Sequence, residues 1–558
     1  MKKHFFLLLV FGASLLSCKA QQVLNDLSQK EVVSKPKLIV GIVIDQMRYD
    51  YLTRFESRYG EGGFKRMMRE GFNCKNNHFN YIPTKTGPGH ASIFTGTTPK
   101  YHGIIGNDWF SKDLKRNVNC VEDTTVVSVG SNTKDGQKSP HRMLSTTLSD
   151  ENRLFTQMKG KSIGISLKHR SAILPAGHSA NAAYWWDYEH DGSGNWISSS
   201  FYLKDLPRWV KDFNTSGKSQ SYFKIWNTLY DINTYRETGV DINAYERLFK
   251  GEKDSSFPHD LPKLREKNGG YKVIAESPYG NELTTDFAIA AIKGESLGND
   301  NVTDVLTISY SSTDKVGHDF GPNSIELEDT YLRLDKDLER LLNFLDRQVG
   351  KGDYTVFLTS DHGAPNVINY LKDNRIPSGL FNLSKMLKEI NDSLSNRYQV
   401  KDLALSRINN QIFLDHDLIE ANGINLKEVK NRVGRLLMSY NLISNVYVTS
   451  EVNNFPYMDG YQEQLLFKGF NQKRSGDIVF AFNPAVFKDT PWNRTGTDHH
   501  SGYNYDTHVP LLFFGKGISS GETWAKTEIT DIAPTICALL NISFPNASIG
   551  NVLEFALD

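Results

Sequence analysis

Carboxylates and imidazoles follow three apolar, β-branched stretches of this sequence, at the point where each stretch ends. They are Asp45 after residues 38–44, Asp314 and His318 after residues 305–310, and Asp361 and His362 after residues 354–359. Apolar runs of this kind are typical of strands buried on both faces, and parallel strands present their carboxyl ends at one edge of a sheet. Mixed carboxylate and imidazole ligands without thiolates favour zinc, with manganese, iron or cobalt as alternatives, and disfavour calcium. The pattern therefore predicts a metal centre at that edge.

The number of candidate ligands indicates more than one ion. Five side chains exceed the needs of one tetrahedral ion. Two ions roughly 4 Å apart form the clamp used for in-line displacement at phosphorus. Late in the chain, His499 and His500 stand just ahead of a further apolar run at residues 509–514. One of them would complete a three-ligand site with Asp314 and His318, and spacing alone does not separate the two.

Thr86 offers a nucleophile. It lies in the segment 81–90, which runs into a helix-like stretch at residues 91–96. A hydroxyl at a helix N-terminus lies where backbone N–H groups and the helix dipole favour negative charge. A threonine alkoxide is inaccessible near neutral pH unless a cation such as zinc stabilises it. Considered alone, Thr86 is better explained as a helix N-cap, so its catalytic role depends on the metal ligands.

The motifs together resemble those of the alkaline phosphatase superfamily. The matching residues are Asp45, Thr86 within residues 83–90, Asp314 and His318, Asp361 and His362 before Gly363, and His499 within residues 496–499. The resemblance covers nearly everything after residue 36. It is greatest to the threonine-nucleophile, phosphate-irrepressible bacterial alkaline phosphatases, whose core is similar to that of nucleotide pyrophosphatases/phosphodiesterases.

The resemblance implies two Zn²⁺ ions per chain and assigns ligands to each. One ion would be held by Asp314, His318 and His499, and the other by Asp45, Asp361, His362 and the oxygen of Thr86. This assignment favours His499 over His500. The resemblance also implies hydrolysis of small phosphate monoesters through a covalent phosphothreonine on Thr86.

Three further residues bear on whether the substrate is a monoester or a diester. Residues 161–167 have a strand pattern that leads into Lys168 and Arg170, and an extended backbone would place both cations on one face. A monoester carries one more non-bridging charge than a diester. Arg170 can grip two oxygens as a planar fork, and Lys168 can act as a point charge. In the resembled monoesterases, an asparagine, a lysine and an arginine at the positions of Asn107, Lys168 and Arg170 contact the phosphoryl oxygens.

Other functions remain open on the same residues. A phosphodiesterase or nucleotide pyrophosphatase of the same superfamily would use the same metals and Thr86. A sulfatase is disfavoured because residues 86–90 lack the Cys or Ser followed by Pro and Arg that is needed to form formylglycine. From a different class, a non-catalytic surface lipoprotein could bind phosphorylated ligands, but a complete set of metal ligands argues against it.

The elements that must position these residues form an alternating pattern. Buried strand-like runs alternate with amphipathic stretches such as residues 325–345, which have apolar side chains at helical spacing. This predicts an α/β fold with a mostly parallel central sheet flanked by helices, spanning residues 37–558. Two regions, about 180–300 and about 385–485, lack the pattern and are predicted to be insertions that pack over the sheet's edge as caps.

Composition limits the partners of the 558-residue chain. Lys and Arg total 64, as do Asp and Glu, so the formal net charge is zero. A neutral surface does not attract nucleic acid polymers or an anionic membrane broadly, which leaves local sites for small phosphate esters. Cys74 and Cys120 could form a disulfide in an oxidising compartment or remain unpaired, and no oligomeric state is indicated.

The N-terminal residues are predicted to direct export. A basic start precedes an apolar run at residues 5–16 that is too short to span a bilayer, and no later stretch reaches the roughly 18 apolar residues of a membrane span. Residues 1–20 are therefore a signal peptide or a lipoprotein signal, and residues 21–36 a polar tether. Residues 15–18 resemble a lipobox, which would leave a lipid on Cys18 as the one membrane contact of an outer-membrane lipoprotein. The alternative is a free periplasmic or secreted protein.

Overall fold

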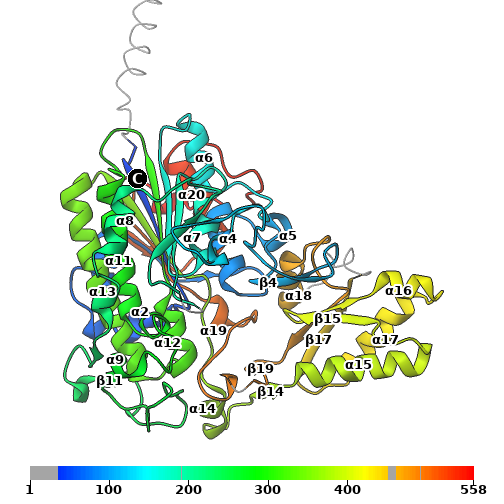
Figure 1. Ribbon diagram of the computed structural model, residues 1–558. Helices are drawn as coiled ribbons and strands as arrows, with labels where there is room; N and C mark the ends of the chain where they lie inside the picture. Colours follow the sequence, from blue (N-terminus) through cyan, green and yellow to red (C-terminus); the bar gives the residue numbers. More distant parts are fainter. Residues whose placement is uncertain (1–34, 190–191, 450–459, 491) are drawn as a thin grey trace, which may run out of the picture. The chain divides into compact units, whose positions relative to one another are not determined.

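A central β-sheet carries the fold of the computed structural model (Figure 1). The structure describes residues 35–189, 192–449, 460–490 and 492–558. Within these residues ten strands join the sheet. In order across the sheet they are β21 (Gly521–Thr523), β2 (Phe72–Cys74), β20 (Leu511–Gly515), β13 (Tyr354–Thr359), β1 (Leu38–Ile44), β12 (Asp304–Tyr310), β7 (Ser162–Ser166), β8 (Ala182–Trp186), β9 (Trp196–Ser199) and β6 (Ser128–Val129).

The central strands β13, β1, β12, β7 and β8 run parallel to one another. Ile44 at the end of β1 pairs with Tyr310 of β12. Val43 of β1 pairs with Thr359 of β13. The segments that follow these strands therefore leave the sheet side by side at its carboxyl edge. The neighbouring strand β20 runs antiparallel to β13, pairing Leu511 with Thr359, so the segment that precedes β20 arrives at the same edge.

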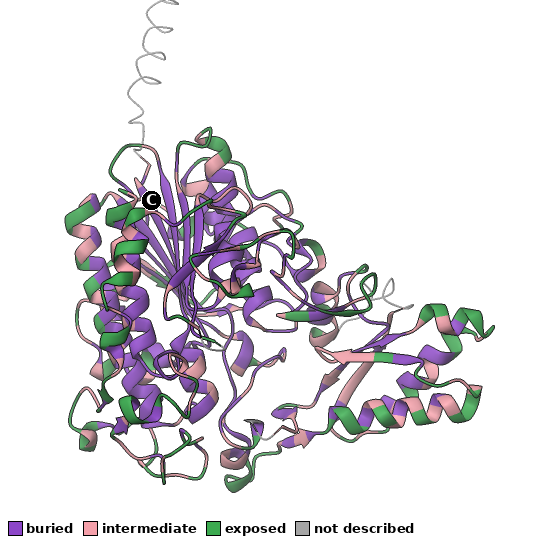
Figure 2. Ribbon diagram, viewed as in Figure 1, coloured by how far each residue is buried: buried purple, intermediate pink, exposed green. Residues whose placement is uncertain are grey.

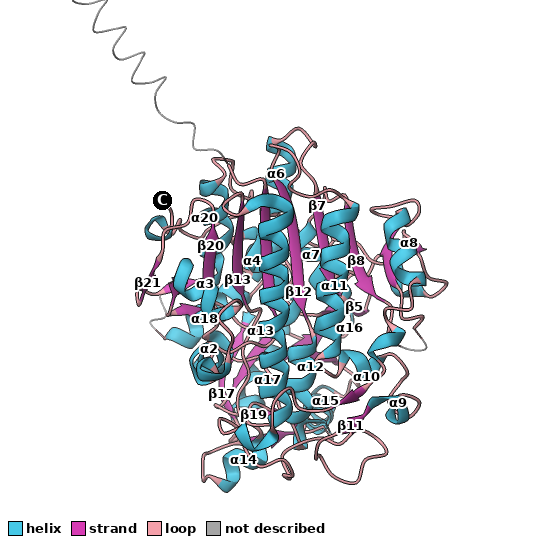
Figure 3. Cartoon of the chain, turned by 90° about the vertical axis from the view of Figure 1, so that its left-hand side faces the viewer, coloured by secondary structure: helices cyan, strands magenta, loops and turns pink. Residues whose placement is uncertain are grey.

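Helices cover both faces of the sheet, as the views in Figures 1 and 3 show. One face carries α11 (Tyr279–Gly294) and α13 (Ile325–Leu345), and the other carries α4 (Thr86–Thr95), α7 (His169–Ala176) and α20 (Ile532–Leu539). Val40 and Ile42 of β1 pack in the core on the α13 side. Ile39 and Val43 pack in the core on the α4 side. Because both faces are covered, β1 is apolar at nearly every position and lies in the buried, purple part of Figure 2.

Shorter elements complete the chain around these layers. The other helices of the main layers and loops are α2 (Asp50–Arg54), α3 (Phe64–Glu70), α5 (Pro99–His102), α6 (Leu148–Phe155), α8 (Arg208–Thr215), α9 (Leu261–Leu264), α10 (Lys272–Ala275), α12 (Ser312–Phe320), α14 (Ile368–Asp373) and α19 (Asn504–Thr507). Small strand pairs are β3 (Asn77–His78) with β22 (Thr527–Glu528), β4 (Asp108–Ser111) with β5 (Arg116–Asn119), and β10 (Ile225–Trp226) with β11 (His259–Asp260).

The predicted α/β class and mostly parallel sheet flanked by helices are confirmed. The first predicted cap is wrong, because part of that region belongs to the central sheet. The region about 180–300 was predicted to be an insertion over the sheet's edge. Its first part instead supplies β8 and β9 to the central sheet, and its last part is α11. The aromatic residues 184–186 are buried within β8 between the two helical layers, so an unusual composition concealed a core strand. The segment between α8 and α11 consists of short elements and loops.

The second predicted cap region, about 385–485, forms a small module with its own apolar core. Its sheet has the order β15 (Ala404–Ile408), β16 (Gln411–Leu414), β18 (Ile478–Phe482) and β17 (Ile443–Val448), and its helices are α15 (Leu383–Tyr398), α16 (His416–Ala421), α17 (Leu426–Met438) and α18 (Tyr461–Gly469). At its base, β14 (Gly379–Phe381) pairs in parallel with β19 (Val486–Lys488). Hydrogen bonds connect the module to the rest of the α/β fold. In two of them, Asn409 Nδ2 donates to the carbonyl oxygen of Asp108 at 2.6 Å, and Ile82 N donates to the carbonyl oxygen of Leu465 at 3.2 Å.

The described residues bear on the predictions about membrane spans and about a disulfide, but not on the predicted N-terminal signal. None of the described helices is both long enough and apolar enough to cross a membrane. The signal predicted at residues 1–20, with Cys18, and most of the tether at residues 21–36 lie outside the described residues. Cys74 and Cys120 are buried free thiols, so the disulfide that the sequence left open is not formed.

A substitution at Gly164 in β7 tests how closely α7 packs on the sheet. A Cβ at Gly164 would lie 2.1 Å from the carbonyl oxygen of Ala172 in α7. We expect Gly164→Ala to lower the free energy of unfolding by about 1–3 kcal/mol, because α7 must move away from the sheet. Chemical denaturation of the purified protein measures this change.

The matched control for this substitution is Gly521→Ala on the edge strand β21. A Cβ at Gly521 would meet only the ring of Phe72, at 3.2 Å, and the ring can shift. Gly521→Ala should therefore lower the free energy of unfolding by less than about 1 kcal/mol. Equal losses for the two variants would contradict the tight packing of α7 on β7.

Candidate active site

Thr86 is the first residue of α4, and its side chain is 2% exposed. The N-cap of α4 is Lys85, in an extended conformation, and not Thr86. Pro88 fits the first turn because its missing N–H would have no partner inside the helix. Gly89 packs directly on the loop after β13, where a Cβ would lie 2.5 Å from the carbonyl oxygen of Asp361. The start of α4 is thus held against that loop, and Thr86 Oγ1 makes no hydrogen bond to any residue that the structure describes.

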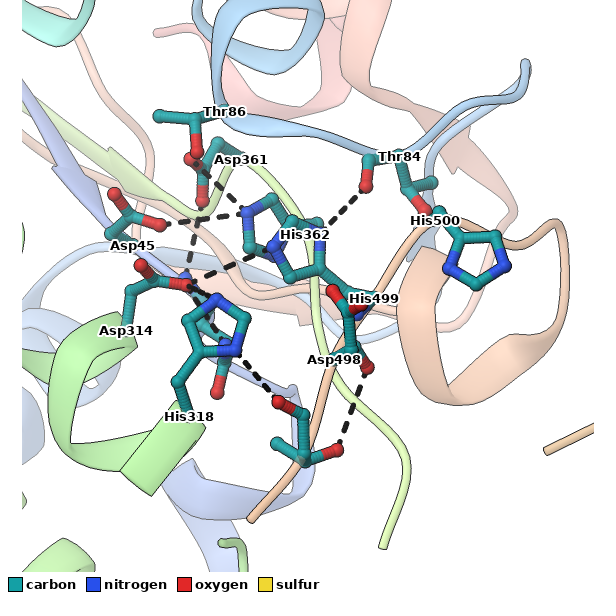
Figure 4. A network of polar contacts seen from close by, with 12 residues as sticks. Asp45, Thr84, Thr86, Asp314, His318, Asp361, His362, Asp498, His499 and His500 are labelled. Atoms are coloured by element: carbon teal, nitrogen blue, oxygen red, sulfur yellow. Dashed lines mark hydrogen bonds and ion pairs between the residues drawn. The ribbon is translucent and has the colours of Figure 1, made fainter. Parts of the chain in front are cut away.

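One candidate metal group consists of Asp45, Asp361 and His362. Their ligand atoms lie within 4.8 Å of one another, and all three residues are buried (Figure 4). His362 Nε2 lies 3.5 Å from Asp45 Oδ1 and 3.5 Å from Asp361 Oδ2. These three atoms are buried without a hydrogen-bond partner among the described residues. Orphaned polar atoms that converge on one point fit a bound cation, and the donor set suits zinc.

The second candidate centre lies around Asp314 and His499. One group joins Asp314, His362 and His499, and another joins His318, Asp498 and His499. Asp314 Oδ1 lies 3.0 Å from His318 Nε2 and 3.8 Å from His499 Nε2. The sequence prediction named Asp314, His318 and His499 and missed Asp498. The position of Asp498 directly before His499 is a signal in the sequence that could have identified it.

Backbone carbonyls orient the imidazoles of this site. The Nδ1 atoms of His318, His362 and His499 lie 2.7, 3.0 and 2.8 Å from the carbonyl oxygens of Thr497, Gly363 and Thr84, respectively. A ring whose Nδ1–H donates to a carbonyl keeps its proton there and presents the Nε2 lone pair, which is the arrangement found around metal-ligating histidines. The chain therefore aims three Nε2 atoms into one space.

His500 takes no part in these groups. Its ring contacts Phe482 of β18, with ring centroids 5.8 Å apart, and its backbone N donates to Asp506 Oδ2. Figure 4 shows the ring lying away from the side chains gathered around Asp314. Of the two adjacent histidines that spacing could not separate, His499 is the one that faces the centre.

Three buried carboxylates, Asp45, Asp314 and Asp361, crowd this edge of the sheet. Lys168 Nζ bridges two of them, at 2.7 Å from Asp45 Oδ2 and 2.5 Å from Asp314 Oδ2. Burial and the charge of Asp314 raise the pKa of Asp45, and burial and the charge of Asp45 raise the pKa of Asp361. Burial disfavours the charge of Lys168, but Asp314 and Asp45 outweigh burial and raise its pKa. One ammonium group does not balance three carboxylates, so bound divalent cations would complete the charge.

The sequence pattern predicted that Lys168 and Arg170 lie at the end of a strand, and this prediction is wrong. β7 ends at Ser166, Lys168 is the N-cap of α7, and Arg170 lies in the first turn of that helix. Ser166 Oγ accepts the backbone N–H of Lys168 and ends the extended run. Both cations still line one pocket, because the first turn of α7 starts beside β7. Arg170 Nε is buried and unpaired within the described part of the chain.

Asn107 lies in the turn before β4 and is fixed by the start of α4. Its Oδ1 accepts the backbone N–H of Gly87 at 2.7 Å. Because the oxygen is engaged, the amide N–H₂ remains available to an acceptor beside Thr86. The structure thus holds Asn107 against the start of α4, next to Thr86.

Two supporting residues were missed by the sequence prediction. His90 Nδ1 lies 2.8 Å from the carbonyl oxygen of Thr86, and its Nε2 lies 2.9 Å from Ser309 Oγ. Gln46 Nε2 donates to Asp314 Oδ1 at 2.8 Å. The i, i+4 spacing of Thr86 and His90 on α4 was a visible signal for the first, whereas no local pattern indicates the second.

A mostly parallel α/β sheet with paired carboxylate–imidazole groups at its carboxyl edge defines a class of metal-dependent ester hydrolases. Residues 39–504 match the family described as type I phosphodiesterase / nucleotide pyrophosphatase, and the chain belongs to this family of the alkaline phosphatase superfamily.

Several relatives match this chain over nearly its whole length. The alkaline phosphatase PhoV of Synechococcus elongatus is 44% identical over 98% of this chain and 98% of its own. The alkaline phosphatase PafA of Elizabethkingia meningoseptica is 43% identical over 93% of this chain and 94% of its own. The crystal structure of wild-type PafA matches with a TM-score of 0.90 and 41% identity, covering 95% of this chain and 100% of that chain. A Myroides odoratus protein named calcium-transporting ATPase is 44% identical over 95% of this chain and 96% of its own.

We expect Asp498→Asn to weaken zinc binding by about 10- to 100-fold, because the carboxylate that stands beside His318 and His499 is replaced by a neutral amide. Competition with a chromogenic chelator measures zinc affinity without reference to activity. His500→Gln is the matched control, since it alters the neighbouring imidazole that lies outside the candidate groups, and it should retain the wild-type affinity. An unchanged affinity in Asp498→Asn would contradict a role for this carboxylate at the metal centre.

Proposed function

We propose that this chain is an alkaline phosphatase that hydrolyses small phosphate monoesters with two zinc ions, through a covalent phosphothreonine on Thr86. The observation that carries the proposal is the free hydroxyl of Thr86 beside the Asp45, Asp361 and His362 group, whose facing atoms have no partner within the described residues. Full-length similarity to the alkaline phosphatases PhoV and PafA supports it.

The donor sets fit the proposed ions. Asp45, Asp361, His362 and Thr86 Oγ1 would hold one ion, and Asp314, His318 and His499 the other, with Asp498 close to the second. When bound, the ions would lower the pKa of the Thr86 hydroxyl and of a water molecule and would offset the charge of the phosphoryl group.

The reaction then proceeds in two in-line displacements at phosphorus. In the first, Thr86 Oγ1 gives up its proton and forms a bond to phosphorus while the bond to the ester oxygen breaks, and the alcohol leaves after taking up a proton. In the second, a water oxygen forms a bond to phosphorus, the Oγ1–phosphorus bond breaks, and inorganic phosphate leaves with Thr86 restored. The N-terminus of α4 favours the negative charge that develops beside Thr86 in both steps.

Three side chains hold the non-bridging oxygens of the transferring group. Asn107 offers its amide N–H₂, Lys168 its ammonium, and Arg170 a guanidinium whose Nε is buried without a partner in the described chain. A monoester dianion gains more from two cations than a diester monoanion does. A PafA variant of known structure has a threonine replaced by serine and an asparagine, a lysine and an arginine replaced by alanine, the same four residue types. The pair of cations favours a monoesterase over the phosphodiesterase alternative, which would use the same metals and Thr86.

The proposal includes export of the enzyme. Residues 1–20 would act as the export signal and residues 21–36 as a tether to the catalytic domain at residues 37–558. After export the protein would be a periplasmic enzyme, an outer-membrane lipoprotein held by a lipid on Cys18, or a secreted protein. Its substrates would be small phosphate monoesters, without a nucleic acid polymer as partner.

Replacement of the nucleophile tests the covalent route. We expect Thr86→Ala to lower kcat/KM for an aryl phosphate monoester by at least about 10³-fold, because the attacking oxygen is removed. Thr86→Ser retains a hydroxyl and should retain turnover, and brief acid quenching with ³²P-labelled substrate should trap phosphate on the serine. Wild-type turnover in Thr86→Ala would rule out Thr86 as nucleophile.

Arg170→Ala tests the choice between monoester and diester. The substitution removes donors that a dianion needs more than a monoanion does, so kcat/KM should fall about 10²-fold on an aryl monoester and less than about 10-fold on the matching diester. Steady-state kinetics on both esters, with zinc content measured on the same sample, supply the comparison. Equal losses on the two esters would argue for the phosphodiesterase alternative.

A further inference from the structure

The pocket lined by Lys168 and Arg170 extends beyond the metal groups along the carboxyl edge of the sheet. Strands β12, β7 and β8 are neighbours and run parallel, and the segments that follow them supply Lys315, then Lys168 with Arg170, then Tyr188 to the lining. The cavity has a volume of about 220 Å³. Because about 10–15 Å³ is enough for one water molecule, the pocket has room for a small charged group together with its water.

Two lysines of this pocket have no role in the reaction described above. Lys315 lies on α12, and its Nζ is 6.0 Å from the centre of the Tyr188 ring. Lys138 lies in the segment between β6 and α6. Both residues are partly exposed, so an incoming ligand can approach them. Neither lysine forms an ion pair with a carboxylate of the described residues.

Positive charge is in excess around the cavity. Its lining holds four cations and two carboxylates, which are Lys138, Lys168, Arg170 and Lys315, and Asp135 and Glu189. Burial and the neighbouring Asp187 raise the pKa of Asp135, so this residue adds less negative charge than its type suggests. Lys168 is already paired with carboxylates of the metal groups, and Arg170 is proposed to hold the phosphoryl group. Lys138 and Lys315 therefore remain for a second anionic group.

Lys168 and α12 connect this pocket to the side from which the alcohol leaves. Lys168 lines the pocket, and its Nζ lies 2.5 Å from Asp314 Oδ2. Asp314 is a proposed ligand of the ion that does not hold Thr86, and Lys315 follows it on α12. In an in-line displacement the alcohol oxygen departs opposite the attacking oxygen, which is the side of Asp314. A substituent on the alcohol can therefore extend into the pocket beside Lys315.

We propose that this pocket selects phosphate monoesters whose alcohol carries a second anionic group, a carboxylate or a further phosphate, with Lys138 and Lys315 as the specificity-determining residues. The inference rests on the proposed phosphatase function and names the substrate class that this site prefers. The two ammonium groups attract the second anion and orient the alcohol, while the phosphoryl group occupies the site beside Thr86.

A matched pair of aryl phosphates tests this preference. 3-Carboxyphenyl phosphate and 3-carbamoylphenyl phosphate have nearly the same shape and differ by one negative charge. For the zinc-loaded wild-type enzyme we expect kcat/KM to be about 3- to 10-fold higher on the carboxylate than on the amide, because partly exposed ammonium groups attract an anion only modestly. The preference should shrink as the salt concentration rises, since salt screens exposed charges.

Three variants locate the preference. Lys138→Gln and Lys315→Gln each remove one ammonium group and should reduce the carboxylate-to-amide ratio of kcat/KM about 2- to 4-fold. Lys134→Gln is the matched control, because Lys134 is an exposed lysine of the same segment as Lys138 and does not line the pocket, and it should keep the wild-type ratio. A loss of metal or of folded protein lowers kcat/KM for both esters together, so the ratio reports on the pocket itself. A ratio that neither pocket substitution changes, or an equal drop in Lys134→Gln, would overturn the proposal.

Binding of two inhibitors separates this proposal from the phosphatase function. 3-Carboxybenzylphosphonate and 3-carbamoylbenzylphosphonate carry the same two substituents on a group that cannot be hydrolysed. Titration calorimetry with the zinc-loaded wild type should give a Kd about 3- to 10-fold lower for the carboxylate, and the variant with both Lys138→Gln and Lys315→Gln should bind the two nearly equally. If neither aryl phosphate is hydrolysed, the phosphatase function fails, and the calorimetric comparison still decides whether the pocket prefers an anion. Equal Kd values in the wild type would overturn the preference whatever the kinetics show.

Discussion

Crowding of carboxylates at the carboxyl edge of the sheet governs the architecture of this protein. Asp45, Asp314 and Asp361 are held there by the ends of three adjacent strands, with almost no water to solvate their charge. Burial of ionised groups is costly unless opposite charge stands among them. Lys168 provides some of this opposite charge, and three histidines present Nε2 atoms to the same space. The fold thus keeps a strongly acidic cluster that bound cations would stabilise.

Much of this arrangement was predictable from the sequence because the decisive signals are local. Runs such as residues 38–44 are apolar at nearly every position, which indicates cover on both faces, and the residue that follows each run emerges at the edge. Once the strands are parallel, register alone brings Asp45 beside Asp361. The superfamily resemblance rested on the same residues, and the match to the PafA structure over 95% of this chain confirms the fold that it implied.

Other parts of the fold and the site could not be predicted, because they depend on contacts between segments far apart in the sequence. His499 differs from His500 because the carbonyl oxygen of Thr84 engages its ring, a contact that joins positions 415 residues apart. The strand pattern before Lys168 stops early because Ser166 caps its backbone and a helix begins. The aromatic β8 was assigned to a cap because composition does not reveal which apolar residues meet the sheet's helices. Sequence periodicity carries no information about partners of this kind.

The position of the small module has a consequence for the order in which the metal centre forms. The module occupies the chain between β13 and β20, which are neighbours in the sheet. Synthesis from the N-terminus therefore delivers Asp45, Asp361 and His362 first, then an independent apolar core, and His499 only afterwards. The first group can therefore be complete in the chain while the second still lacks a histidine. Completion of the second group thus requires that the module has been made, whereas completion of the first does not.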